Sequence, residues 1–89
     1  MPIELVFRRV RDAVAGVRIE RLTVTHAADD DNVWWVWTGT GREADADRSV
    51  QIDTHPGGTP PFLLEGSTPG QRLESSDATE ATAAILKWL

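Results

Sequence analysis

The sequence contains no cysteine and a single lysine. The absence of cysteine excludes disulfide frameworks, CxxC redox chemistry, cysteine-based zinc sites and thiol nucleophiles. No apolar run approaches the roughly 18 residues that a membrane-spanning helix needs, and the N-terminus lacks the basic, apolar and small-residue order of a signal peptide. We therefore expect a single cytoplasmic domain over residues 1–89 that has no membrane partner.

Basic charge is scarce, because Lys and Arg number 9 against 14 Asp and Glu, which gives a net charge of −5. Five of the arginines lie in residues 1–28, and residues 29–89 are strongly acidic. Sequence-independent affinity for nucleic acid comes from Lys and Arg that neutralise phosphates, so we expect no nucleic-acid partner. Glu4, Arg8 and Asp12 are spaced four residues apart, which predicts ion pairs along one face of an N-terminal helix.

Recognisable catalytic motifs are missing as well. The serines lie in no nucleophile elbow, and the glycines match neither a phosphate-binding loop nor a dinucleotide fingerprint. Glu43, Asp45 and Asp47 lie in a glycine- and acid-rich stretch, which is typical of an exposed loop. Acid–base catalysis needs burial or a close like charge to raise a carboxyl pKa, and such a loop provides neither. We therefore expect a protein that is not an enzyme and has no cofactor.

The spacing of apolar residues predicts a helix at each end of the chain and strands between them. The predicted elements are helices at 3–15 and from Asp77 to the end, and strands at 33–38, 49–54, 62–65 and 71–75, with a proline-rich loop at 55–61. Between Val17 and His26 the apolar parity changes. Either a β-bulge near Glu20 and Arg21 shifts the register, or the strand begins near Arg21.

Short connections between these strands favour an antiparallel meander, because parallel pairing would need longer crossovers. Two helices can cover one face of such a sheet. The predicted fold class is therefore α+β: a two-layer sandwich of three to five antiparallel strands with an N-terminal and a C-terminal helix on one face, in the order α-β-β-β-(β)-α.

This order resembles the topology of double-stranded-RNA-binding domains, and the alanine-rich stretch ATEATAAIL at 78–86 suits their closing helix. Those domains carry a Lys-rich cluster at the start of that helix. Here residues 75–80 read SSDATE, with two acids and no base. The resemblance therefore implies a similar fold and no RNA binding.

Tryptophans dominate the second strand. Trp34 and Val36 point to one side of the strand, and Val33, Trp35 and Trp37 point to the other. One set cannot lie beneath the helices, so we expect at least one tryptophan in an exposed aromatic patch, which usually marks an interface. Alternatively, the loop that follows this strand or the C-terminal residues fold back and bury the patch. A stacking platform for bases is a third and weaker interpretation.

The two histidines offer a metal-binding alternative. In a meander, His26 and His55 end strands that run the same way, so they emerge at one sheet edge about 10 Å apart. Asp53 shares the side of His55, and Asp29 to Asp31 leave the same edge, so imidazole and carboxylate could converge on zinc or manganese. The competing interpretation is that both are ordinary strand-end histidines, since no HExxH or HxH spacing is present.

The leading hypothesis is a small non-catalytic binding protein of bacterial type, such as an inhibitor, immunity protein or adaptor. It presents an aromatic sheet face with an acidic rim that steers a basic protein partner. The residues expected to bind are Trp34, Trp35, Trp37, Glu43, Asp45 and Asp47. The alternatives are a metal-binding or hydrolase-like site at the His26 and His55 edge, and a homodimer through the tryptophan face without separate activity.

Overall fold

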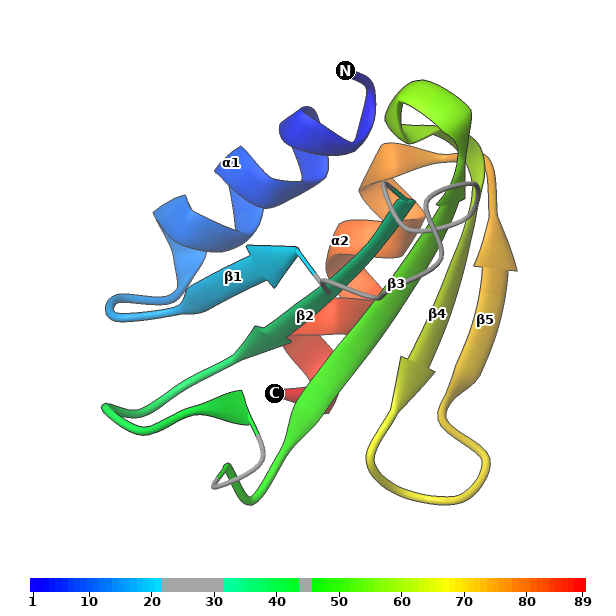
Figure 1. Cartoon of the computed structure of the whole chain (residues 1–89). Helices are drawn as coiled ribbons and strands as arrows, with labels where there is room; N and C mark the ends of the chain where they lie inside the picture. The colour runs from blue at the N-terminus through cyan, green and yellow to red at the C-terminus, as the bar shows by residue number, and fades with distance from the viewer. Residues whose placement is uncertain (22–31, 44–45) are drawn as a thin grey trace.

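The computed structural model describes residues 1–21, 32–43 and 46–89. Its elements are α1 (Ile3–Ala13), β1 (Arg18–Arg21), β2 (Val33–Trp37), β3 (Ser49–His55), the short 3-10 turn η3 (Pro56–Gly58), β4 (Thr59–Gly66), β5 (Arg72–Ser75) and α2 (Ala78–Trp88). The strands form one antiparallel sheet in the order β1-β2-β3-β4-β5. Both helices pack on one face of this sheet (Figure 1). The predicted α+β sandwich is confirmed, with five strands.

Helix α1 forms because apolar side chains recur at three- and four-residue spacing and place one stripe against the sheet. Its buried residues are Ile3, Val6, Phe7 and Val10. The helix ends before Val14, whose extended backbone and N–H bond to the Val10 carbonyl close the last turn. Gly16 then adopts a φ of 76°, a left-handed conformation that favours glycine and turns the chain into β1.

The predicted ion pairs along α1 are wrong. The carboxylate of Glu4 lies 3.1 Å from the N-terminal amine, and this is the one ion pair among residues 1–21, 32–43 and 46–89. Arg8 and Asp12 are exposed. Long exposed side chains gain little from pairing in water, so helical spacing permits these pairs without enforcing them.

Helix α2 begins at a side-chain cap. The Asp77 carboxylate accepts a hydrogen bond of 2.8 Å from the Thr79 backbone N–H. The Ser75 hydroxyl, at the end of β5, accepts a bond of 3.0 Å from the Asp77 N–H, so the backbone N–H of the cap residue bonds to the preceding strand. Arg9 also donates to the Thr79 hydroxyl at 3.0 Å, which joins the two helices.

The register of β1 excludes one of the two alternatives, a strand that begins only near Arg21, and shows no bulge up to Arg21. Arg18 to Arg21 pair in unbroken register with Trp37 to Trp34 of β2, so the strand is formed before Arg21. Ile19 is half-buried against the core, opposite Val36. The change of parity farther along falls on Leu22 to His26, outside the described residues.

The prediction of a loop over 55–61 is wrong for its second half, because β4 already begins at Thr59. The ladder between β3 and β4 is irregular here: His55 pairs with Thr59, whereas Asp53 pairs with Leu63. Pairing of β4 with β5 begins only at Phe62. Pro60 and Pro61 therefore lie where neither neighbouring strand needs a backbone N–H, which is where a sheet tolerates proline.

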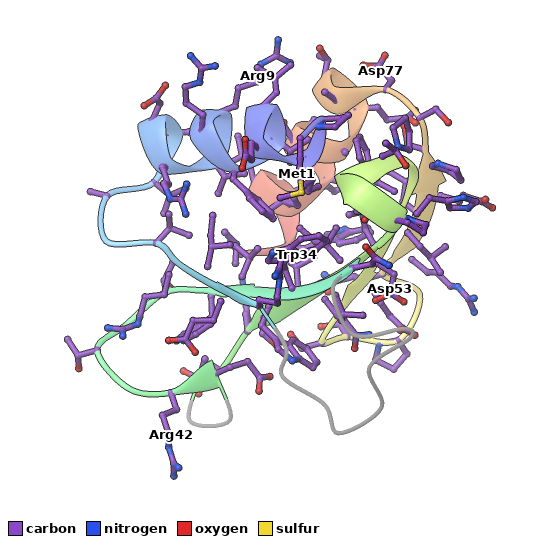
Figure 2. The ribbon with its side chains drawn as sticks, turned by 45° about the horizontal axis from the view of Figure 1, so that its top comes forward. Met1, Arg9, Trp34, Arg42, Asp53 and Asp77 are labelled. Atoms are coloured by element: carbon purple, nitrogen blue, oxygen red, sulfur yellow. The ribbon has the colours of Figure 1, made fainter. Side chains whose placement is uncertain are left out.

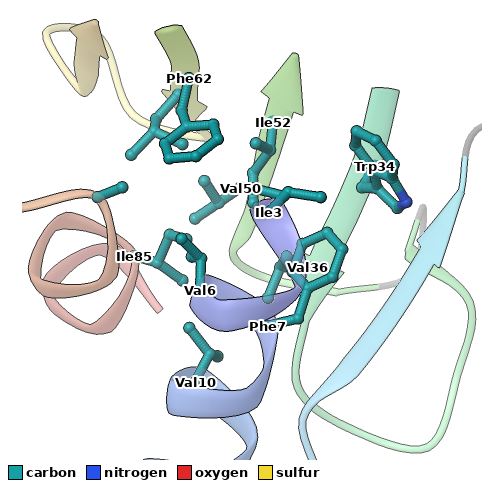
Figure 3. Close-up of a cluster of buried hydrophobic side chains, with 12 residues drawn as sticks. Ile3, Val6, Phe7, Val10, Trp34, Val36, Val50, Ile52, Phe62 and Ile85 are labelled. Carbon is teal, nitrogen blue, oxygen red and sulfur yellow. The ribbon is translucent and has the colours of Figure 1, made fainter. Parts of the chain in front are cut away.

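The core lies between the sheet and the helices. The buried cluster combines one face of α1, the inward residues of β2, β3 and β4, and Ala81 and Ile85 of α2 (Figure 3). Trp34 is 5% exposed and meets Phe7 edge to face, with ring centroids 5.6 Å apart. Trp34 and Val36 are thus the set beneath the helices.

Candidate binding face of the sheet

We call the sheet surface opposite the helices the open face. Figure 2 shows the helices on one side of the sheet, with Trp34 directed toward them. Along every strand the residues between the core positions point the other way. The open face therefore carries the described side chains Arg18, Glu20, Val33, Trp35, Trp37, Ser49, Gln51, Asp53, Leu63, Glu65, Arg72 and Glu74.

Trp35 occupies the middle row of this face. The strand register places it beside Glu20 of β1 and Gln51 of β3, and the row continues through Glu65 to Arg72. Its side chain is half-buried, in contrast to its neighbours Trp34 and Trp37. Trp35 is therefore the tryptophan of β2 that keeps an accessible surface.

Trp37 points to the same face but is 1% exposed. Its indole Nε1 donates a hydrogen bond of 3.1 Å to the Gly41 carbonyl, and the Arg18 guanidinium lies 5.8 Å from the ring centroid. The connection after β2 is thereby tied to the indole. The expected exposed patch is corrected here: one indole is covered from within the chain, one is half-buried, and among the described residues no tryptophan is exposed.

A shallow hollow of about 150 Å³ lies at the other end of the open face. Asp53, Leu63 and Glu74 are aligned across three strands by the register, and His55 and Pro61 complete the lining together with Thr54. The Asp53 carboxylate accepts a bond of 3.1 Å from the Gln51 side chain. The hollow thus combines an apolar floor with two carboxylates.

The charges of the open face are predominantly acidic. Among the described residues, the strands of this face carry four acidic side chains, Glu20, Asp53, Glu65 and Glu74, and two basic ones, Arg18 and Arg72. Glu65 and Arg72 are direct cross-strand neighbours. At one end, Glu43 accepts a bond of 3.2 Å from the Ser49 hydroxyl. The helix layer differs, because Arg8, Arg9 and Arg11 are all exposed on α1.

The predicted binding residues are only partly brought together. Trp35 and Glu43 belong to the open face or its margin, and Asp47 is exposed in the connection before β3. Asp45 lies outside the described residues. Trp34 is buried in the core, and Trp37 is covered by the chain itself, so neither indole is accessible on the open face.

Sequence reasoning missed Glu74 and Pro61 as parts of this face. Leu73 is the central apolar residue of the predicted strand at 71–75 and belongs on its buried side, which implies that Arg72 and Glu74 point outward. Pro61 could not be placed in the same way, because its position depends on the irregular register between β3 and β4.

The metal hypothesis gains no support from the described residues. His55 is exposed at the end of β3 beside Asp53, but nowhere in residues 1–21, 32–43 and 46–89 do three or more His, Cys, Asp or Glu side chains gather closely enough to hold a metal ion. His26 and Asp29 to Asp31 lie outside this part of the chain. The site at their edge stays a prediction.

Comparison with protein-family models, curated proteins and solved structures finds no match to this chain. Among the helices described, none is both long and apolar enough to cross a membrane. Function must therefore be argued from the surfaces of the molecule.

Proposed function

We propose that this protein is a non-catalytic binding module that docks a basic protein partner on the open face. The observation that carries the proposal is the position of Trp35, which is half-buried and keeps an accessible surface in the middle of a sheet face that neither helix covers. Tryptophan is among the residues most enriched at binding hot spots, particularly near the centre of an interface. Trp35 is accordingly the proposed anchor.

The hollow at the end of the open face supports a basic partner. A Lys or Arg side chain could lay its apolar stem against Leu63 and Pro61 while its charged head meets Asp53 and Glu74. Charge-assisted hydrogen bonds of this kind are stronger than neutral ones. The remaining acids of the face would attract a basic surface during approach, which raises the association rate.

The same charges argue against a homodimer through this face. A two-fold axis brings the same patch of both subunits together. Glu20, Glu65 and Glu74 of one copy would then meet an equally acidic surface, and like charges brought together cost free energy. A partner of opposite charge avoids this cost, so we favour a different protein over a second copy.

Affinity capture from the source cells followed by reconstitution tests the proposal. Immobilised wild type, Trp35→Ala and Leu86→Ala proteins are compared, since Leu86 is a 37% exposed apolar residue on the helix layer. Each protein that is captured by the wild type and by Leu86→Ala but not by Trp35→Ala is purified. Its binding kinetics are then measured at low and high salt. We expect Trp35→Ala to raise the Kd by roughly 30-fold, the effect of losing about 2 kcal/mol at a hot spot.

Two further outcomes complete the test. Glu20→Gln should slow association at low salt with little effect at high salt, because Glu20 is an exposed acid of the open face outside the hollow and such charges act mainly on the association rate. The proposal fails if every captured protein binds Trp35→Ala and wild type equally. It also fails if light scattering shows a tight dimer that Trp35→Ala dissociates, since the face would then be satisfied by a second copy.

A further inference from the structure

A second hollow, of about 340 Å³, lies on the helix side of the sheet between α1 and the edge strand β1. Its lining is Met1, Glu4, Phe7, Arg11, Ile19, Arg21 and Trp34. No strand lies beyond β1 in the sheet order of the described residues, so the hollow opens to solvent along this edge. It shares no lining residue with the hollow of the open face.

The floor of this hollow is apolar and its walls are cationic. Phe7 and Trp34 meet edge to face with ring centroids 5.6 Å apart, and Ile19 of β1 adjoins them. The Arg11 guanidinium lies 6.0 Å from the centroid of Phe7, and the Arg21 guanidinium lies 5.6 Å from that of Trp34. Each aromatic ring of the floor is therefore bordered by a guanidinium.

The geometry of these arginines suits an anion. A guanidinium beside an aromatic ring gains from the ring's negative face and still has five N–H donors with which to bind a carboxylate. In the described part of the chain, Arg11 makes no hydrogen bond or ion pair besides this ring contact. The acid in the lining, Glu4, is already 3.1 Å from the N-terminal amine. Among the residues that line the hollow, the two arginines and the N-terminal amine of Met1 outnumber the single acid, in a chain whose net charge is −5.

We propose that this hollow binds a small organic carboxylate with an apolar body. The body would contact Phe7, Trp34 and Ile19, and the carboxylate would accept hydrogen bonds from Arg11, with Arg21 contributing positive charge. The volume of the hollow falls at the lower end of the range for small-molecule pockets, which combine apolar walls with a few polar groups. The site is independent of the protein-docking function proposed for the open face.

Nuclear magnetic resonance titration with 3-phenylpropionate tests the proposal, and 3-phenylpropionamide serves as the neutral probe of the same shape. We expect saturable shifts of the Trp34 indole and Ile19 amide signals with the carboxylate, and at least about tenfold weaker binding of the amide, which corresponds to the loss of one charge-assisted interaction. Arg11→Gln should weaken binding of the carboxylate about tenfold and leave binding of the amide unchanged.

Arg8→Gln is the matched control, because Arg8 is an exposed arginine of the same helix that does not line the hollow. It should leave both affinities unchanged. Arg11 is exposed, so its replacement leaves the core intact, and a thermal melt of each variant verifies this. Absence of saturable shifts at Trp34 and Ile19, equal binding of acid and amide, or equal effects of Arg11→Gln and Arg8→Gln would each overturn the proposal.

Discussion

Trp34 and Trp35 are adjacent in sequence but lie on opposite faces of the sheet, which makes a sharp prediction for their replacement by alanine. A tryptophan buries about 150–250 Å², and at about 25 cal/mol per Å² this burial contributes about 4–6 kcal/mol. Trp34 is 5% exposed and keeps nearly all of this contribution. We expect Trp34→Ala to lower the free energy of unfolding by about 3–5 kcal/mol, as measured for large aromatic residues in cores.

Trp35→Ala should cost much less, about 1 kcal/mol, because the side chain is half-buried and its removal leaves no closed cavity. Urea unfolding followed by circular dichroism gives both values by linear extrapolation. A domain of this size has a total stability of about 4–13 kcal/mol, so Trp34→Ala could unfold the protein entirely. Trp34→Phe then provides a milder variant, which should still cost more than Trp35→Ala. Equal costs, or a larger cost for Trp35→Ala, would refute the assignment of the faces and with it the proposed anchor.

Three other predictions concern the parts that support the open face and the helix layer. Trp37→Phe removes the indole donor to the connection after β2 and should cost about 1 kcal/mol, with faster hydrogen exchange confined to that connection. Asp77→Ala removes the cap of α2 and should cost about 1 kcal/mol in thermal unfolding, whereas Asp77→Asn should be nearly neutral. Gly58→Ala should destabilise more than Gly57→Ala: both have positive φ, but the new Cβ at Gly58 would lie 2.7 Å from an α1 side chain, while at Gly57 nothing lies within 4 Å. Similar costs for the two glycines would contradict this packing.

The antiparallel order of the sheet could be predicted from the short connections between strands, and its two faces could be predicted in part from the alternation of apolar residues. Val50 and Ile52 alternate with Gln51 and Asp53, which marks the buried side of β3 without any knowledge of the structure. In β2 both parities are apolar, so the strand itself does not reveal which side is buried. The buried side of β2 follows from its register with β3, in which Trp34 lies opposite Ile52. That register could not be derived from the sequence, because the connection between the two strands has no regular turn.

The state of each tryptophan depended on contacts between distant or irregular segments. Trp37 shares parity with Trp35, yet it is 1% exposed, with its indole bonded to the Gly41 carbonyl and the Arg18 guanidinium 5.8 Å from its ring centroid. Periodicity carries no information about such a contact, because the connection has no repeating pattern. The early start of β4 was missed for a related reason. Pro60 has no backbone N–H to donate, which argued against a strand there. The irregular pairing of β3 with β4 removes the need for that N–H, and the sequence of one strand does not reveal such a pairing.

The edges of the sheet restrict how a partner can dock. Both edge strands have four residues, RIER in β1 and RLES in β5, and short, charged edges discourage pairing with another strand. A two-fold pairing of β1 with its copy, centred on the strand, would place Arg18 opposite Arg21, and like charges directly opposite destabilise a sheet. A partner therefore meets the side chains of the open face more readily than the backbone of an edge. In the proposed binding mode, affinity would depend on a few side chains, Trp35 above all, and single substitutions there should have large effects on binding and small effects on the fold.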